Sequence, residues 1–391
     1  MEISKLGEFG LIDHLTKDLV IHNTSTIKGV GDDCAVIGNF LQSPSQGVGG
    51  ADGQCGVKRE DGDKLMLVTT DMLMEGIHFD LTYISMQHLG YKSAMVNISD
   101  IFAMNGTPRQ LTVSIALSKR FTVEDLEQFY TGLRLACDRW NVDIVGGDTT
   151  SSLTGLAISI TCIGEVSHEN IAYRSGARDT DLLCVSGDLG AAYMGLQLLE
   201  REKAVYYQQL NELNAKIKAS RADGTYEQKK AYFEHQRELF SDFQPEFAGK
   251  EYLLQRQLKP EARGDIVELL RTANIRPTSM MDISDGLSSE ILHICKQSNA
   301  GCRLYEKNIP IDYQTAVMAD ELNLNVTTCA LSGGEDYELL FTVPIGDYER
   351  VQELKDVKVI GHITKPDLGV MLITRDGQEL PITAQGWNPL K

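Results

Sequence analysis

Two aspartates lie three positions apart in the segment SMMDISDGLSSE, residues 279–290, with a serine between them and a glycine directly after them. Asp282 follows an apolar run, and Asp285 precedes a segment with helical spacing. Two carboxylates this close repel each other unless a cation lies between them or one of them caps a helix. The first possibility indicates a metal site, and the second indicates only a local turn.

The same pattern, an apolar strand followed by a glycine or hydroxyl residue and then an acid, recurs along the chain. The further acids of this kind are Asp32 and Asp33 after the glycine turn of GVGDDCAVI, Asp71 in LVTTDMLMEGIHF, Asp148 in VGGDTTSS, and Glu335 and Asp336 in LSGGEDYELLF. Asp100 in VNISDIFAMNG differs, because it lies three positions after Asn97 on one side of an expected helix. Each one alone has an ordinary explanation as a turn, a cap or a solvated helix position. Strand ends beside small flexible residues are also where ligands bind in layered folds.

Convergence of these acids in one pocket would require divalent cations. Two unit charges about 4 Å apart cost roughly 4 kcal/mol at an effective dielectric of 20, and five or six such charges would be untenable. Hard oxygen ligands select Mg²⁺ over zinc, and Mg²⁺ held in this way keeps waters and coordinates phosphates. The sequence therefore predicts a magnesium centre that carries a nucleotide, although the common phosphate-binding motifs G-x-x-x-x-G-K-[ST] and H-R-D with D-F-G are absent.

The composition narrows the possible partners. Acidic residues outnumber basic ones by 55 to 37, which gives a formal net charge of −18. This charge argues against sequence-independent binding to nucleic acid. The eight cysteines are scattered without a C-x-x-C pair, and the sequence has neither a signal peptide nor an apolar run long enough to span a membrane. We therefore expect a protein of the reducing cytoplasm with no membrane partner.

Alternating strand-like and helical segments must position the acids. Strand patterns occur at residues 64–71, 110–117, 142–148, 155–166, 181–187, 278–284, 337–343 and 357–364. Helical spacing occurs at residues 86–106, 123–140 and 286–301. Because 391 residues are too many for one ordinary core, we expect two α+β domains, residues 1–166 and 167–391.

Two segments have the composition of insertions. Residues 41–63 are rich in glycine and serine, which predicts a flexible loop. Residues 199–257 are dense in charged residues and glutamine, with apolar residues at regular intervals, which predicts a helical hairpin. The simplest interpretation of this hairpin is a solvated decoration or an oligomer contact.

Seven segments, in this order, resemble those of the thiamine-monophosphate kinase family: GDDCAVI, TTDMLMEGIHF, VNISDIFAMNGTPRQLTVSIAL, GGDTTSS, YRSGARDTDLLCVSGDLG, DISDGLSSE and LSGGEDYELLFTV. The family belongs to the superfamily of aminoimidazole ribonucleotide synthetase, selenophosphate synthetase and a hydrogenase maturation factor. The resemblance covers nearly all of the chain except residues 41–63 and most of 199–257. It implies a two-domain α+β fold, with an N-terminal mixed sheet whose helices pair across a homodimer and a C-terminal α/β sandwich.

The resemblance also implies a reaction and roles for individual residues. The reaction would be direct in-line transfer of the ATP γ-phosphoryl group to thiamine monophosphate, giving thiamine diphosphate, with several Mg²⁺ ions. The metal ligands would be Asp33, Thr69, Thr70, Asp71, Asp100, Asp148, Asp282 and Asp285. ATP would contact Gly147, Asp148, Arg174, Ser284 and Tyr130, and thiamine monophosphate would contact His78, Glu335 and Trp387.

The residues themselves support these roles unequally. A lone guanidinium at Arg174 in acidic surroundings suits bidentate contact with phosphate. His78, in contrast, could be an ordinary strand histidine, and Trp387 could merely anchor the C-terminus. The acceptor is a phosphate monoester that is already ionised at neutral pH, so alignment and charge neutralisation suffice and no catalytic acid or base is needed.

Other members of the superfamily and an inactive scaffold are the alternatives. A selenophosphate synthetase should carry a reactive cysteine and lysine in a glycine-rich N-terminal segment, where this chain offers only Cys55 in GQCGV. The hydrogenase maturation factor ends in a cysteine-bearing tail, whereas this sequence ends in NPLK. A catalytically silent nucleotide-binding scaffold would use the hairpin of residues 199–257 as its contact surface. Mg²⁺-dependent ADP release that requires thiamine monophosphate separates the kinase from these alternatives.

Overall fold

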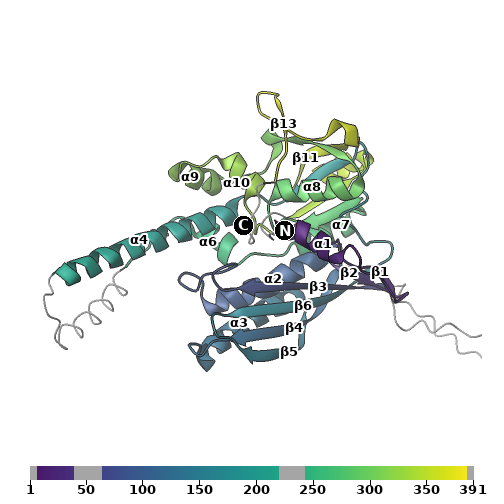
Figure 1. Ribbon diagram of the computed structural model, residues 1–391. Coiled ribbons are helices and arrows are strands. Elements are labelled where there is room, and N and C mark those ends of the chain that lie inside the picture. Colours follow the sequence, from purple (N-terminus) through teal and green to yellow (C-terminus); the bar gives the residue numbers. More distant parts are fainter. Residues whose placement is uncertain (1–6, 39–63, 220–242, 385–391) are drawn as a thin grey trace, which may run out of the picture.

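The computed structural model describes residues 7–38, 64–219 and 243–384. Its described strands form two sheets that lie in separate halves of the molecule, with helices packed on both (Figure 1). The strands of the first sheet fall between residues 26 and 167, and those of the second fall between residues 182 and 381. This is the two-domain α+β architecture that the sequence predicts. The predicted loop of residues 41–63 lies outside the described residues.

The N-terminal sheet has the strand order β1-β2-β3-β6-β4-β5. Its strands are β1 (Thr26–Lys28), β2 (Ala35–Ile37), β3 (Lys64–Met74), β4 (Thr107–Leu117), β5 (Asp143–Ser151) and β6 (Ala157–Ser167). All neighbours are antiparallel except β4 and β5. Burial alternates strictly along β6, which is the pattern of a sheet with one face packed on a core.

Helix α2 (Met86–Ala103) lies between this sheet and the C-terminal half, and it is buried along most of its length. Helix α3 (Val123–Trp140) packs against it at two reciprocal glycines. A Cβ atom on Gly90 would lie 1.9 Å from the carbonyl oxygen of Phe129, and one on Gly132 would lie 1.8 Å from that of Gln87. Only glycine permits the two helices to approach this closely. This contact therefore sets the position of α2 and of the site residues on it.

The C-terminal sheet has the strand order β13-β12-β9-β11-β7-β10-β8. Its strands are β7 (Leu182–Ser186), β8 (Ser279–Asp282), β9 (Gly301–Tyr305), β10 (Leu339–Val343), β11 (Val357–Thr364), β12 (Val370–Ile373) and β13 (Glu379–Pro381). Only the pair β9 and β12 is parallel. The strands β7, β8 and β10 are buried throughout, so both faces of this part of the sheet are covered.

Further helices are α1 (Gly7–Thr16), α7 (Gly264–Thr272), α8 (Leu287–Ser298), α9 (Tyr313–Glu321), α10 (Val326–Ser332) and α11 (Tyr348–Gln352), with 3₁₀ turns at Glu306–Asn308, Ile345–Asp347 and Pro366–Leu368. No helix in the described part of the chain is both long and apolar enough to cross a bilayer.

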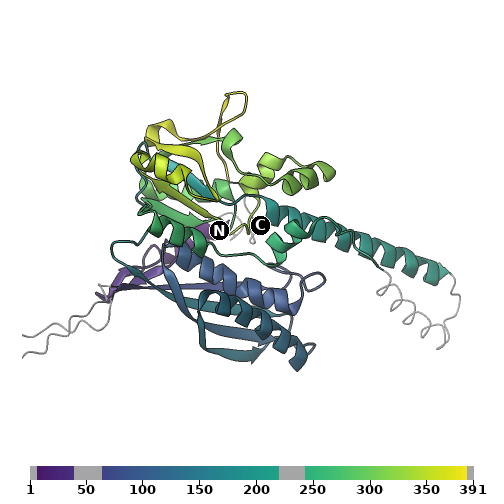
Figure 2. The same ribbon diagram turned by 180° about the vertical axis from the view of Figure 1, so that it is seen from behind.

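The segment predicted as a helical hairpin is described only in part. Helix α4 (Ala191–Ala219) begins inside the C-terminal half and projects far from it (Figures 1 and 2). Helix α6 (Glu251–Leu258) returns along the base of α4, and residues 220–242 lie outside the described residues. Because α6 also contacts α2, the end of this segment packs against both halves of the molecule and is more than a solvated decoration.

Candidate active site

A cleft of about 1360 Å³ is lined by residues from both halves of the molecule. The N-terminal half contributes β3, the loop after it and α2, and the C-terminal half contributes α4, α10 and the loops after β8 and before β10. The cleft brings together most of the predicted site residues, namely Asp33, Thr69, Thr70, Asp71, His78, Asp100, Arg174, Asp282, Ser284, Asp285 and Glu335. Residues that are far apart in the sequence therefore share one cavity.

Asp33, Asp100 and Asp282 form the centre of this acidic group. Each offers a carboxylate oxygen, and these oxygens all lie within 4.8 Å of one another. Thr69 Oγ1 donates a hydrogen bond of 2.5 Å to Asp100, and Ser99 Oγ donates one of 2.5 Å to Asp282. Each of these hydroxyls thus holds one oxygen of its carboxylate in place.

The carboxylates of this cluster are buried and repel one another. Burial, followed by repulsion from Asp71 and Asp282, raises the pKa of Asp100 well above its ordinary value. Burial and the charge of Asp33 raise the pKa of Asp282 to about 7. A cation bound at the cluster would offset this repulsion and favour the charged form of both carboxylates. The donor set consists of oxygen atoms alone, and this is the chemistry that suits Mg²⁺.

Arg174 supplies a counter-charge to the cluster within the chain itself. Its Nη2 and Nε lie 2.7 Å and 3.2 Å from the two carboxylate oxygens of Asp33, and its backbone N–H donates to Asp32 at 3.1 Å. Lys28 pairs with Asp32 at 2.6 Å. The guanidinium predicted to contact ATP therefore binds Asp33 and lines the same cleft as the acidic cluster.

Asp285 lies just before the helix that follows it and is connected to that helix through Glu290. Helix α8 begins after Gly286, which has a positive φ of 117° and, as the N-cap residue, offers no side chain to the first turn. The backbone N–H of Asp285 donates to Glu290 Oε1 at 2.9 Å. Glu290 is a buried acid that the sequence analysis missed, and burial followed by the charge of Asp285 raises its pKa well above the ordinary value. Gly286, and not Asp285, thus occupies the N-cap position of α8.

The other end of the cleft contains His78 and Glu335. Glu335 Oε1 lies 2.6 Å from the ammonium of Lys92, and its Oε2 accepts a hydrogen bond of 2.7 Å from Gln257. His78 Nδ1 accepts a hydrogen bond of 3.0 Å from the backbone of Met74, and burial lowers the pKa of His78. The imidazole is therefore neutral at pH 7, and its Nδ1 acts as an acceptor.

Lys92 and Gln257 were not among the site residues predicted from the sequence. Lys92 lies eight residues before Asp100 on α2, and a spacing of eight places the two side chains about 80° apart around the helix axis, within one broad face. A lysine on the face of a helix that also carries a candidate metal ligand was the signal available in the sequence. Gln257 lies in the segment interpreted as an insertion, and nothing in its local pattern indicates a site.

The cleft beyond His78 is lined by Tyr83 and by several charged residues. Lys203 of α4 pairs with Asp80 of the loop after β3 at 2.8 Å, and its ammonium lies 5.6 Å from the ring centre of Tyr83. Burial, followed by a hydrogen bond to Glu200, raises the pKa of Tyr83. These contacts connect the two halves of the molecule at this end of the cleft.

Four predicted residues are not among those that line the cleft. Gly147 and Asp148 lie on the edge strand β5, and the register places Asp148 beside Ser114 of β4, which lies beside Ser159 of β6 and then Met72 of β3. Three strand spacings of about 4.8 Å put Asp148 roughly 14 Å from β3 within one chain. Tyr130 packs on Phe129 at a ring distance of 5.7 Å. Trp387 lies outside the described residues.

Comparisons with known proteins show which proteins this chain is similar to. A model of the "AIR synthase related protein, N-terminal domain" family matches residues 31–166. The thiamine-monophosphate kinase of Aquifex aeolicus is 31% identical over 388 residues, with 99% of each chain covered. That of Escherichia coli K12 is 28% identical over 400 residues, with 98% of each chain covered. A solved structure of AaThiL complexed with AMPPCP and TMP aligns with a TM-score of 0.72 at 29% identity, covering 99% of this chain and 98% of that chain.

Proposed function

The chain belongs to the thiamine-monophosphate kinase family, and we propose that it carries out this family's reaction in the cleft between its two halves. Family membership makes the protein a phosphotransferase that uses ATP and thiamine monophosphate. The observation that carries the proposed site is the group formed by Asp33, Asp100 and Asp282, whose carboxylate oxygens lie within 4.8 Å of one another inside that cleft.

The acids of the cleft fit Mg²⁺ ions, which would neutralise the charge that two phosphate-bearing substrates bring together. Asp33, Asp100 and Asp282 would hold the metal, with Thr69, Thr70, Asp71 and Asp285 of the same cleft as further ligands. The raised pKa values of Asp100 and Asp282 support this assignment, because carboxylates crowded in this way are stable in the charged form only beside a cation.

Arg174 would orient the nucleotide. Its guanidinium holds both oxygens of Asp33, and a planar fork of this kind is equally suited to two phosphate oxygens. When Asp33 serves as a metal ligand, Arg174 can turn one or both of its N–H groups to the nucleotide. Ser284, which lies between Asp282 and Asp285 and lines the cleft, would donate a hydroxyl to the same phosphates.

The acceptor would occupy the end that contains His78 and Glu335. Thiamine monophosphate has a permanent cation in its thiazolium ring, and that end of the cleft offers Glu335, Asp80 and Glu200 together with the aromatic face of Tyr83. Its phosphate would face the acidic cluster, where the nucleotide lies. The phosphate oxygen attacks in line and needs no base, because it is already ionised at neutral pH.

We also propose that the protein is a homodimer of the cytoplasm. Strand β5 is an edge strand that is exposed along its whole length, including Ile144 and Val145, and exposed edges of this kind are usually covered. A partner subunit at this edge would bury Gly147 and Asp148. The seven cysteines of the described residues are all buried free thiols, as expected in a reducing compartment.

Product analysis tests the function directly. Purified protein with ATP, Mg²⁺ and thiamine monophosphate should form thiamine diphosphate and ADP in equal amounts, and EDTA should abolish both. Thiamine in place of its monophosphate should give little or no product, since it has no phosphate to act as nucleophile. Formation of ADP at the same rate without thiamine monophosphate would contradict the proposal.

A further inference from the structure

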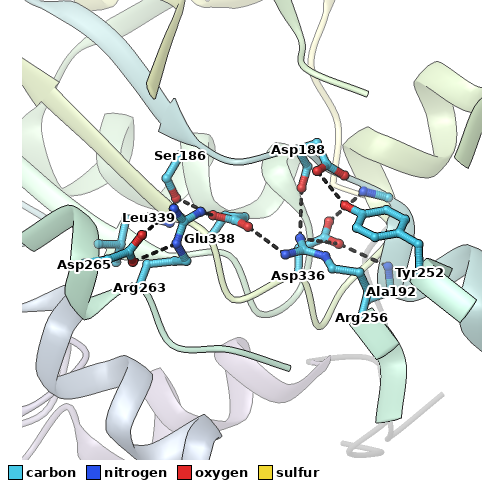
Figure 3. Close-up of polar contacts among 11 residues, drawn as sticks. Ser186, Asp188, Ala192, Tyr252, Arg256, Arg263, Asp265, Asp336, Glu338 and Leu339 are labelled. Carbon is cyan, nitrogen blue, oxygen red and sulfur yellow. Dashed lines mark hydrogen bonds and ion pairs between the residues drawn. The ribbon is translucent and has the colours of Figure 1, made fainter. Parts of the chain in front are cut away.

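A buried network of two arginines and two acids lies next to the cleft and takes no part in the proposed reaction (Figure 3). Its acids are Asp336 and Glu338, which belong to the same short loop as Glu335 and are 2% and 1% exposed. Its arginines are Arg256, near the end of α6, and Arg263, directly before α7. Charged groups this deeply buried have a high desolvation cost, which only close pairing offsets.

Glu338 is held on both of its carboxylate oxygens. Oε1 accepts a hydrogen bond of 2.7 Å from Arg256 Nη1, while Oε2 accepts one of 2.5 Å from Ser186 Oγ and pairs with Arg263. Asp336 is held by the start of α4, because it accepts from the backbone N–H groups of Gly190 at 2.7 Å and Ala192 at 3.3 Å. Arg256 Nη2 lies 3.6 Å from Asp336 Oδ1, so Arg256 connects the two acids.

The side chains of this loop alternate between the network and the cleft. Asp336 and Glu338 point into the network (Figure 3), whereas Glu335 and Tyr337 line the cleft. Glu335 and Tyr337 have positive φ angles of 67° and 52°. Residues with side chains rarely adopt this left-handed conformation, and they keep it only where the surrounding structure enforces it.

Helix α6 reaches this loop from both sides. Arg256 contacts Glu338 and Asp336 in the network, and Gln257, the next residue, donates to Glu335 at the cleft. Arg256 also donates to the backbone carbonyl of Asp188 at 2.9 Å, which fixes the guanidinium in place. The end of the inserted segment therefore contacts the loop both in the network and at the cleft.

We propose that Arg256 is a positioning residue, which holds the loop of residues 335–338 in its left-handed conformation through Asp336 and Glu338 and so fixes the Glu335 carboxylate at the acceptor end of the cleft. The inference rests on the proposed function, in which Glu335 contacts thiamine monophosphate. It gives the return helix of the inserted segment a role in acceptor recognition.

Arg256→Lys is the variant that tests this role. It keeps the buried charge, but a single ammonium cannot reach Glu338, Asp336 and the Asp188 carbonyl together. The matched control is Arg109→Lys, since Arg109 makes a comparable pair with Glu165 at 2.7 Å on the exposed surface of the N-terminal sheet. We expect Arg256→Lys to raise the KM for thiamine monophosphate about tenfold, since small displacements of a contact group weaken binding strongly. Its KM for ATP should stay within about twofold of wild type. Both KM values of the control variant Arg109→Lys should also stay within about twofold of wild type.

The ring protons of His78, followed by NMR, report the position of Glu335 without any turnover. Burial lowers the pKa of His78, and the nearby Glu335 carboxylate raises it. Glu335→Gln should therefore lower the pKa of His78 further, and Arg256→Lys should lower it in the same direction. A change of stability alone would not move this pKa, and the variant His78→Gln assigns the signal.

A double variant decides whether Arg256 acts through Glu335. In a Glu335→Gln background, Arg256→Lys should cause no further change in the His78 pKa or in the KM for thiamine monophosphate. Additive effects, or a His78 pKa that is unchanged in Arg256→Lys, would overturn the proposal. If Arg256→Lys does not fold, Asp336→Asn replaces it with the same expected results. If the wild-type protein makes no thiamine diphosphate, the proposed function fails, while the His78 signal still tests the position of Glu335.

Discussion

The ammonium of Lys92 lies 2.6 Å from a carboxylate oxygen of Glu335, and this ion pair joins the two halves of the molecule inside the cleft. Lys92 belongs to α2 and is only 1% exposed, whereas Glu335 belongs to the loop before β10. A lysine buried to this degree keeps its charge only beside an acid. The pair therefore links the position of α2, which carries Asp100, to that of the acceptor end.

Removal of one partner of this pair should cost stability. Lys92→Met keeps the length of the side chain but leaves Glu335 without its cation. We expect a loss of about 2 kcal/mol in the free energy of unfolding, below the 3–5 kcal/mol typical of fully buried pairs, because Glu335 is partly exposed. Urea denaturation measures the loss. The double variant Lys92→Met, Glu335→Gln should recover part of it, and a double variant less stable than Lys92→Met would contradict this account.

The acidic cluster should be essential for turnover and unfavourable for the stability of the metal-free protein. Asp71→Asn and Asp282→Asn each remove a charge from crowded carboxylates, so kcat should fall by at least about 100-fold. The metal-free variants should unfold at the same temperature as the wild type or at a higher one. Steady-state kinetics and calorimetry provide the two measurements, and wild-type activity in both variants would rule out the cluster as the metal site.

The cluster should also make the stability of the metal-free protein depend on pH. The pKa of Asp282 in the folded state, about 7, lies above the ordinary value of 3.8. Between these values the folded state binds a proton that the unfolded state has released, so the free energy of unfolding falls as pH rises from about 4 to about 7. Urea denaturation in EDTA should show this fall, and Asp282→Asn should make it smaller, while Asp100 and Asp336, whose pKa values are also raised, keep part of it. Added Mg²⁺ should stabilise the protein more at pH 8 than at pH 5, and a pH-independent effect of Mg²⁺ would argue against the assignment.

The glycine contact between α2 and α3 should be sensitive to a single methyl group. In Gly90→Ala the new Cβ would lie 1.9 Å from the carbonyl oxygen of Phe129, so the helices must move apart. We expect a loss of at least about 2 kcal/mol, within the range of overpacked cores, and reduced activity because α2 carries Asp100. Gly346→Ala is the control, since nothing lies within 4 Å of its Cβ. Equal melting temperatures for the two variants would show that the helices are not held by this contact.

The sequence pattern predicted the long elements well and the short ones poorly. The helix predicted at 123–140 and the strand predicted at 357–364 have the observed bounds of α3 and β11. The three- and four-residue strands β1, β12 and β13 and the short helices α9, α10 and α11 were missed, because segments of this length contain too few residues to show a period. Their places depend on the neighbours that they pair with or pack on.

The site was predictable where one local pattern carried it. The acids that follow strands led to Asp33, Asp71 and Asp282, which all line the cleft. Lys92 was missed because a lysine within a helix is usually solvated, and its burial depends on Glu335 from the other half of the chain. Asp148 has the same local pattern as the other acids, but its distance from the cleft follows from the strand order β3-β6-β4-β5, which periodicity does not encode.

Metal binding tests the central claim most directly. Mn²⁺, which takes similar oxygen ligands to Mg²⁺, can be titrated into the protein with a non-hydrolysable ATP analogue and counted by electron paramagnetic resonance. The wild type should bind Mn²⁺ tightly, and Asp100→Asn and Asp282→Asn should lose bound ions while they remain folded by circular dichroism. The same number of ions, bound with the same affinity, in the wild type and both variants would contradict the account.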